Sequence, residues 1–342
     1  MDMTIRLHAI LSMLLLAALT ACDRDDRSVS APAEGELRIS TKSRRESTGA
    51  ADGYEDAVNG LQVLVFSADG MLETYGETDS PKEGLCLTGT AGEKTVWAAA
   101  NAPDLSGIGH LSDLKSATVR LDGNSTDPAR GLAMSGCSTC SVTPGRSGEI
   151  NIPVERLLSR ITLDAITCRL PQAYGSLTVE SVMLINVAGD TDITGTSGPA
   201  AWCNRMGRSS GSPSGIIDGQ SFPADCPEMT FRKIGKTMAP DETVGYEIPL
   251  YCLPNPAEED REGGSSFTPR KTRLVVTATL GGTRYYYPVT IDRPERNTSY
   301  SVSMTITGPG STDPDRPISK QALSFSISVS PWGDGGSYDE RI

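Results

Sequence analysis

The chain has 342 residues, which is long enough for two domains of ordinary size. Its hydrophobic fraction of 37% is sufficient for a buried core, and 35 Gly with 22 Pro favour many turns over long helices. A formal net charge of −12 argues against nucleic-acid binding, which needs a basic face. Only two histidines, His8 and His110, are present, which excludes a His-rich metal site.

The N-terminus is predicted to be an export signal that ends in a lipid-attachment site. Residues 7–21 are almost all apolar, and a run of about 15 residues is too short to span a bilayer but fits a signal peptide. The segment Leu19–Cys22 resembles the bacterial lipobox, in which residues 1–21 would be removed and Cys22 acylated. The alternative is an ordinary secretory signal followed by a Cys. The polar residues 23–35 fit a flexible tether.

Beyond this tether, the sequence predicts short β-strands almost throughout. The predicted strands, in which apolar and polar residues mostly alternate, are 61–66, 95–100, 177–187, 274–280, 285–291 and 300–307. Gly281-Gly282 fits a two-residue hairpin loop between two of them. Helical spacing occurs only within Asp104–Lys115, where Gly107 and Gly109 weaken it. We therefore expect an all-β protein built from sandwiches.

Three segments interrupt the strand pattern. A change near residues 150–154 predicts the boundary between a first domain of about 110 residues and a longer second domain. Residues 196–227 are rich in Gly, Ser and Pro and predict a long loop of the second domain. Residues 308–317 predict a linker before the last strand.

The last strand has the most regular pattern in the chain. Its apolar residues alternate without exception with serines, and Pro331-Trp332-Gly333 ends the run. The apolar positions are Leu323, Phe325, Ile327 and Val329. Such a strand can add to the sheet of another chain, with backbone hydrogen bonds and alternate side chains in pockets. The alternative is a last strand that folds onto its own domain.

The cysteines allow several interpretations. Cys137 and Cys140 form a lone CxxC, which fits a redox pair, half a metal site or a structural disulfide. A zinc site needs a second pair at set spacing, so we predict no metal. Structural disulfides or buried thiols are favoured over catalysis, and Cys203 with Cys226 would brace the long loop.

No motif predicts catalysis or a cofactor. His110 lacks a Gly-x-Ser-x-Gly nucleophile elbow in this chain and is predicted to lie in a loop. The acidic run 258–260 has the residue types of a glycosidase but lies in a polar, Pro-flanked stretch, which predicts a solvated loop. Residues 122–127 lack the spacing and closing Glu of a calcium loop and predict a turn.

Several motifs together resemble the fimbrillin family, the subunits of type V pili of Gram-negative anaerobes. The resemblance covers most of the chain after Cys22. The motifs are the lipobox, the first strand Glu36–Ser40 with the basic loop Thr41–Arg45, Leu61–Phe66 before Asp69-Gly70, Val96–Asn101, Ile152–Ile161, Tyr251–Asn255 and Arg296–Tyr300.

The resemblance implies two transthyretin-like β-sandwiches in tandem and assembly by strand exchange. In the family, an Arg-specific protease cuts after the first strand, which then leaves, and the C-terminal strand of another subunit fills the groove. Arg44 and Arg45 lie at the matching place, and Arg45–Glu46 is the preferred bond. Outside this context, Arg44-Arg45 would be a solvated pair of charges in a loop. An emptied groove has unpaired backbone groups and apolar pockets, so cleavage would drive polymerisation.

The sequence thus predicts a fimbrial subunit lipoprotein that supports adhesion and is not an enzyme. Its partners would be other fimbrial subunits, the maturation protease and the outer membrane through the lipid, with the fimbrium exposed on the cell surface. The predicted segments are a signal peptide at 1–21, a tether with the removable first strand at 22–45, an N-terminal sandwich at 46–153, a C-terminal sandwich at 154–307 with its loop at 196–227, and a linker with the donor-type strand at 308–342.

Two other functions remain open on the sequence. A surface lipoprotein that binds glycans would need an aromatic platform, for which Tyr285-Tyr286-Tyr287 and Trp202 are candidates. A glycoside hydrolase is the third hypothesis. Strand exchange makes a geometric prediction as well: the first strand should pair at a sheet margin, and the last strand should not be enclosed between two fixed strands of its own domain.

Overall fold

The computed structural model describes residues 33–43, 53–207, 215–216, 227–260, 269–318, 322–332 and 338–340. Strands make up 55% of the structure and helices 7%, which confirms the expected all-β class. From Glu34 onward, the described chain forms one compact unit.

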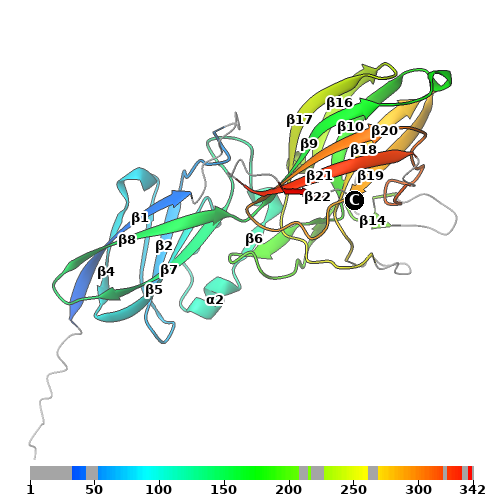
Figure 1. The fold of residues 1–342 in the computed structure, drawn as a ribbon. Helices are drawn as coiled ribbons and strands as arrows, with labels where there is room; N and C mark the ends of the chain where they lie inside the picture. The colour runs from blue at the N-terminus through cyan, green and yellow to red at the C-terminus, as the bar shows by residue number, and fades with distance from the viewer. Residues whose placement is uncertain are drawn as a thin grey trace, which may run out of the picture. The chain divides into compact units, whose positions relative to one another are not determined.

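The first half of the chain supplies one large sheet. Its elements are β1 (Glu34–Ser43), β2 (Leu61–Phe66), β3 (Leu72–Thr78), η1 (Pro81–Glu83), β4 (Leu85–Thr90), β5 (Gly92–Ala100), α2 (Leu111–Lys115), β6 (Thr118–Arg120), η2 (Leu121–Gly123), β7 (Met134–Val142) and β8 (Ser147–Arg156). The sheet has the order β3-β2-β5-β7-β8-β1-β4 (Figure 1).

The two outer strands of this sheet also meet. Thr74 of β3 donates its hydroxyl to the carbonyl oxygen of Thr88 in β4 over 2.5 Å, and the Thr90 amide donates to the Glu73 carboxylate over 3.1 Å. The sheet therefore curls until β3 and β4 touch, and its inner face encloses a core. That core contains Leu37, Ile39, Leu61, Val63, Val65, Leu87, Val96, Ala98, Ala100, Met134, Val142, Ile152 and Val154.

The second half of the chain supplies two larger sheets, and its short strands β11 to β15 form two-stranded pairings, one of them with β6. Its elements are β9 (Ser159–Cys168), η3 (Gln172–Tyr174), β10 (Leu177–Ile185), β11 (Val187–Ala188), β12 (Asp190–Asp192), β13 (Trp202–Cys203), β14 (Met206–Gly207), β15 (Gly215–Ile216), η4 (Glu228–Thr230), β16 (Phe231–Met238), β17 (Thr243–Cys252), β18 (Arg273–Leu280), β19 (Thr283–Thr290), β20 (Thr298–Ile306), β21 (Leu323–Pro331) and β22 (Tyr338–Glu340). The two sheets have the orders β16-β10-β18-β19 and β17-β9-β20-β21-β22.

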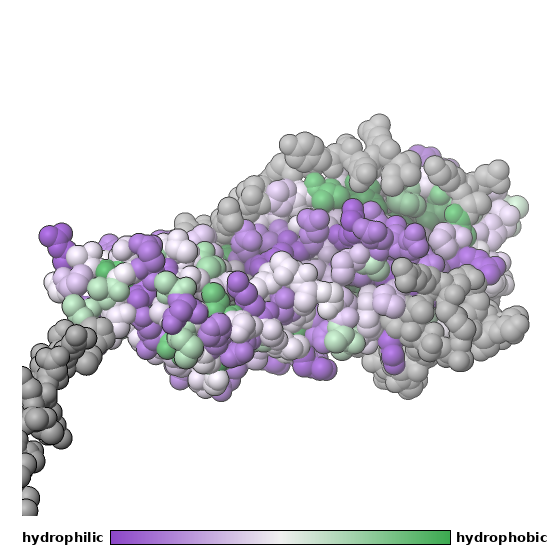
Figure 2. All heavy atoms as spheres, turned by 90° about the horizontal axis from the view of Figure 1, so that it is seen from below, coloured by the Kyte–Doolittle hydropathy of each residue, from purple (hydrophilic) through white to green (hydrophobic). Residues whose placement is uncertain are grey.

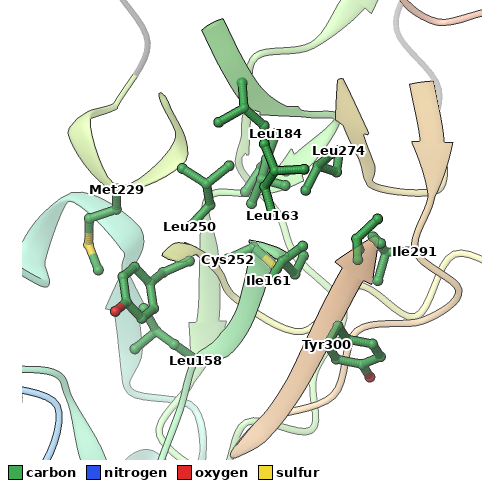
Figure 3. Packing of buried hydrophobic residues seen from close by; sticks show 14 of the residues in the cluster. Leu158, Ile161, Leu163, Leu184, Met229, Leu250, Cys252, Leu274, Ile291 and Tyr300 are labelled. Atoms are coloured by element: carbon green, nitrogen blue, oxygen red, sulfur yellow. The ribbon is translucent and has the colours of Figure 1, made fainter. Parts of the chain in front are cut away.

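These two sheets share one hydrophobic core. Ile161 and Leu163 of β9 and Leu250 of β17 belong to one sheet, and Leu184 of β10 and Leu274 of β18 belong to the other. Figure 3 shows these side chains converging between the sheets. Because alternate residues of each strand face the same side, the period-two pattern of the sequence produces a sandwich here.

The predicted turns and loops are realised with one difference. Gly281 and Gly282 join β18 to β19 with φ of +58° and +82°, the left-handed conformation that a tight hairpin requires. The helix is shorter than its pattern indicated, because α2 begins only after Gly107 and Gly109. Asp104 instead accepts a hydrogen bond from the Ser106 amide at 2.8 Å, which closes a turn.

The domain boundary near 150–154 stays a prediction. Phe66 and Trp97 of the first half belong to the same core cluster as Ile161 of the second half. Strand β6 of the first half also pairs with β12 of the second half. The predicted loop 196–227 contains the short strands β13, β14 and β15, and most of its remainder lies outside the described residues.

Candidate assembly site

Strand β1 lies inside its sheet. It lies beside β8 in Figure 1 and pairs parallel to β8 and antiparallel to β4. In this register Ile39 lies opposite Ile150 on one side and Leu85 on the other. The expectation that this strand lies at the sheet margin is therefore wrong. The reason is the curl of the sheet: after η1 the chain returns as β4, which covers the free edge of β1 and reaches β3.

The two faces of β1 differ in chemistry. Leu37 and Ile39 are 2% and 0% exposed and point into the core, whereas Glu36, Arg38 and Ser40 are exposed. Full burial of an aliphatic side chain stabilises a fold by about 1.5–3 kcal/mol. Strand β1 therefore fills part of the core, and its removal would leave two apolar pockets.

Gly35 marks the narrowest part of the space that β1 occupies. A Cβ atom on Gly35 would lie 2.5 Å from the Thr143 carbonyl oxygen and 2.8 Å from Val142 Cγ1. Real Cβ atoms essentially never approach backbone so closely. A strand that replaces β1 therefore needs a glycine at the position of Gly35 or must end before that position. Strand β21 contains no glycine.

Strand β4 depends on β1 for its backbone pairing. In the sheet order β4 is the last strand, and β1 is its hydrogen-bonded neighbour. Its contact with β3 runs through the side chains of Thr74 and Glu73. Loss of β1 would leave unpaired N–H and C=O groups on both β4 and β8. The result would be a gap one strand wide, with walls that can pair with a new strand.

Strand β21 lies in its own sandwich. It pairs antiparallel with β20 along its whole length, from Leu323 opposite Ile306 to Pro331 opposite Thr298. On its other side the three-residue β22 pairs with residues 327–329 alone. The last strand thus folds onto its own domain, which is the alternative interpretation. The expectation that it is not enclosed between two strands of that domain is wrong for residues 327–329, because β22 covers its outer edge there.

The alternation in β21 separates its two faces as expected. Leu323 is buried, and Phe325, Ile327 and Val329 are half-buried against the sandwich core. The serines lie on the other face, where Ser326 is exposed and opposes Ser303 of β20. The pattern that would suit a donor strand therefore also fits the strand into its own subunit.

Trp332, directly after β21, is a contact that the sequence analysis did not identify. It is 0% exposed, its indole N–H donates to Glu55 Oε2 over 3.1 Å, and its ring stacks on Tyr251 with centroids 5.8 Å apart. The guanidinium carbons of Arg156 and Arg160 lie 4.6 Å and 5.3 Å from the indole centroid. A Trp immediately after the alternating run, in a chain with three Trp, was the available signal.

The predicted processing residues stay predictions. Cys22, Arg44, Arg45 and Glu46 lie outside the described residues, and β1 ends at Ser43, immediately before Arg44. In the part of the chain that the structure describes, no helix has the length and apolar character needed to cross a membrane.

The structure does not form the disulfide considered for Cys137 and Cys140. Both residues are thiols in β7, and because they are three residues apart in a strand, their side chains point to opposite faces. Burial raises the pKa of the Cys140 thiol, which lowers its reactive thiolate fraction. Cys203 lies in β13, and its proposed partner Cys226 lies outside the described residues.

The candidate catalytic residues have structural contacts instead. His110 precedes α2, and its Nδ1 accepts a hydrogen bond from the Ser112 amide at 3.1 Å. In the run 258–260, exposed Glu258 pairs with Arg293 over 3.2 Å. Asp122, in the suspected calcium loop, pairs with Arg120 over 2.9 Å. Among residues with described placement, no three His, Cys, Asp or Glu side chains gather as a metal site would require.

The candidate glycan platform is not assembled. Tyr287 is fully buried and Tyr285 packs against the same core, whereas Tyr286 points to the opposite face of β19. Among the described large apolar side chains, those that are exposed are Met71 and Tyr174. Figure 2 shows hydrophilic residues over much of the face seen there. A flat array of aromatic rings is therefore missing from the described surface.

Comparison with known proteins agrees with this architecture. Residues 33–150 match a family model described as the major fimbrial subunit protein (FimA). A fimbrilin (FimA) from Porphyromonas gingivalis superposes with a TM-score of 0.61 at 17% identity, over 88% of this chain and 98% of that one. A protein from Parabacteroides distasonis described as a cell adhesion protein gives 0.63 at 18% identity, over 88% and 100%.

A third solved structure has the same fold. The C-terminally truncated tip fimbrial protein Mfa3 from Porphyromonas gingivalis gives a TM-score of 0.54 at 15% identity, over 87% of this chain and 100% of that one. The resemblance to the fimbrillin family is therefore confirmed, by the match of residues 33–150 to the major fimbrial subunit protein (FimA) family and by a fold shared with fimbrilin over most of the chain.

Proposed function

We propose that this chain is a fimbrial structural subunit that is exported as a lipoprotein, polymerises by donor-strand exchange and supports adhesion. The family match and the shared fold support a fimbrial adhesion subunit at the cell surface, with other fimbrial subunits as partners and without a catalytic role. Lipid on Cys22 would hold the precursor at the outer membrane. The two tandem transthyretin-like sandwiches belong to the same proposal.

The marginal position expected for β1 is wrong, and the proposal instead rests on β1 as a strand inserted between β8 and β4. Its chain continues directly into Arg44 and Arg45, so a cut there would separate β1 covalently from the rest of the core. Departure of β1 would uncover two backbone edges and the pockets of Leu37 and Ile39. A strand with large apolar residues at every second position can pair with both backbone edges and place its side chains in both pockets. Strand β21 of a second copy has that pattern.

The test is proteolysis of the purified chain that begins at residue 23. Low-dose trypsin should clip after Arg44 or Arg45, and the clipped protein should form a ladder of oligomers whose subunits begin at Arg45 or Glu46. A variant with Arg44→Gln and Arg45→Gln should stay uncut there and monomeric. A chain that ends before Leu323 should be clipped but should not polymerise.

Monomers alone after complete clipping, with no difference in the truncated chain, would refute polymerisation by this strand. The glycan-binding alternative makes the opposite prediction, which is binding to a glycan array without any ladder. Sequencing of the mature N-terminus from cells separates the forms of the subunit: an acylated Cys22 marks an anchor subunit or an uncut form, and Glu46 marks a polymerised subunit.

A further inference from the structure

The residue that follows β21 has a more deeply buried side chain than most apolar residues of the strand itself. Phe325, Ile327 and Val329 are only half-buried, whereas Trp332 is completely buried and is one of the largest fully buried side chains of the described structure. Its backbone is fixed too, because the Trp332 amide donates to the Asn297 carbonyl oxygen over 2.9 Å. The end of the chain's last long strand is therefore anchored at one point.

Glu55 is the polar centre of the pocket around Trp332. It is 2% exposed, and its carboxylate accepts hydrogen bonds from the Tyr251 hydroxyl at 2.6 Å, the Arg160 guanidinium at 2.9 Å and the Trp332 indole at 3.1 Å. The Tyr54 hydroxyl donates to the Tyr251 hydroxyl at 2.5 Å, because Tyr251 gives its one proton to Glu55. A buried carboxylate is tolerated only when it is paired and hydrogen-bonded, so withdrawal of the indole would leave one of its bonds unmade.

Arg156 completes the pocket from the end of β8. It is 1% exposed, donates to the Glu55 carbonyl oxygen at 2.8 Å and to Asn297 Oδ1 at 3.0 Å, and forms an ion pair with Asp56. Its charge lies over the face of Trp332, where the negative face of the ring attracts a cation. The pocket thus joins the segment before β2, the end of β8 and the second half of the chain.

We propose that this pocket is an intramolecular binding site for the Trp332 indole that locks β21 in its own subunit before assembly. The proposal rests on the proposed function, in which β21 must leave to serve a second copy. Because Trp332 follows Pro331 directly, β21 cannot leave as a whole while the indole stays between Arg156 and Tyr251. Release of β21 therefore requires the indole to leave its pocket as well as the pairing with β20 to open.

The test uses Trp332→Phe and Glu55→Gln in the chain that begins at residue 23. Trp97→Phe is the matched control, because Trp97 is also buried but lies in β5, and its indole N–H has no hydrogen-bond partner among the described residues. Hydrogen exchange of the 323–331 peptide should be at least tenfold faster in both pocket variants than in the parent. Exchange of the β18 peptide, residues 273–280, should be unchanged, as should both peptides in Trp97→Phe.

Oligomer ladders after clipping then separate the two proposals. The lock predicts that clipped Trp332→Phe assembles faster than the parent chain. Unchanged exchange of 323–331 in both variants, or an equal rise in 273–280, would overturn the lock even if ladders form at the parent rate. Faster exchange confined to 323–331 without ladders in any clipped chain would leave the lock in place and overturn strand exchange instead.

Discussion

Replacement of Ile39 by Ala measures how strongly β1 fills its place in the sheet. Ile39 is 0% exposed and packs in the core that β1 shares with β8 and β4. Truncation of a buried Ile to Ala costs about 2–5 kcal/mol, through lost burial and the cavity left behind. Arg38→Ala is the control, because Arg38 is the neighbouring residue of the same strand and points to solvent. Exposed substitutions change stability by about 0.5 kcal/mol or less.

Two assays measure this difference. In urea unfolding of the uncut chain, a loss of about 2 kcal/mol lowers the transition midpoint by about 0.7 M or less, because a chain of this size has a slope of about 3 kcal/mol per M or more. In the clipped chain, mass spectrometry after gel filtration measures how long the β1 peptide stays bound. If the same loss of about 2 kcal/mol lowers the barrier to dissociation, the β1 peptide dissociates about 30-fold faster. The reason is that about 1.4 kcal/mol corresponds to a tenfold change in rate.

Equal urea midpoints and equal rates of peptide release for Ile39→Ala and Arg38→Ala would mean that the apolar face of β1 does not hold it in the sheet. A lower urea midpoint with an unchanged rate of peptide release would mean that Ile39 stabilises the folded chain as a whole but does not retain β1 in the sheet.

Three further predictions follow from individual residues. Gly35→Ala should lower stability by about 1–3 kcal/mol through its clash with Thr143, whereas Gly107→Ala, which has open space, should not, as thermal unfolding can measure. Burial by itself would raise the pKa of Glu73, but hydrogen bonds from Lys94 and Thr90 outweigh it and hold the pKa below its usual 4.5. Glu73 therefore stabilises the fold above about pH 4.5 and loses this effect as the pH falls further, so Glu73→Gln should flatten that part of an acid-unfolding curve. Iodoacetamide should modify both Cys137 and Cys140 in the unfolded, unreduced protein, and their protection would contradict the structure.

The strands could be predicted from the sequence wherever the alternation of apolar and polar residues determines the local structure. Leu61–Phe66, the hairpin around Gly281-Gly282 and the alternation of 323–329 each follow from neighbours in sequence, because one face of each strand must be buried. The short helix α2 illustrates the limit of local pattern: spacing alone suggested Asp104–Lys115, but glycines confined the helix to its last five residues.

The candidate assembly site could not be predicted from the sequence, because it depends on contacts between residues that lie far apart along the chain. Strand β1 pairs with β8, more than 100 residues later, so the curl that places β4 outside β1 could not be derived from the alternation of either strand. Trp332 and Glu55 are separated by 277 residues, and each looks ordinary in its own segment. The sequence predicted which face of a strand is buried, and the structure was needed to show what covers it.

The outward faces of β1 and β21 are where the two strands differ most. Both send apolar residues inward at every second position, but β1 sends Glu34, Glu36 and Arg38 outward, and β21 sends only serines. Charges keep a released strand soluble and make it a poor template for aggregation. In the proposed strand exchange, a donor strand would approach another copy of a chain whose net charge is −12. The repulsion between copies acts over about 8 Å at physiological salt, and an uncharged strand adds nothing to it. The inward pattern thus fits each strand to a sheet, and under the proposed strand exchange the outward residues would suit β1 to leave and β21 to join another copy.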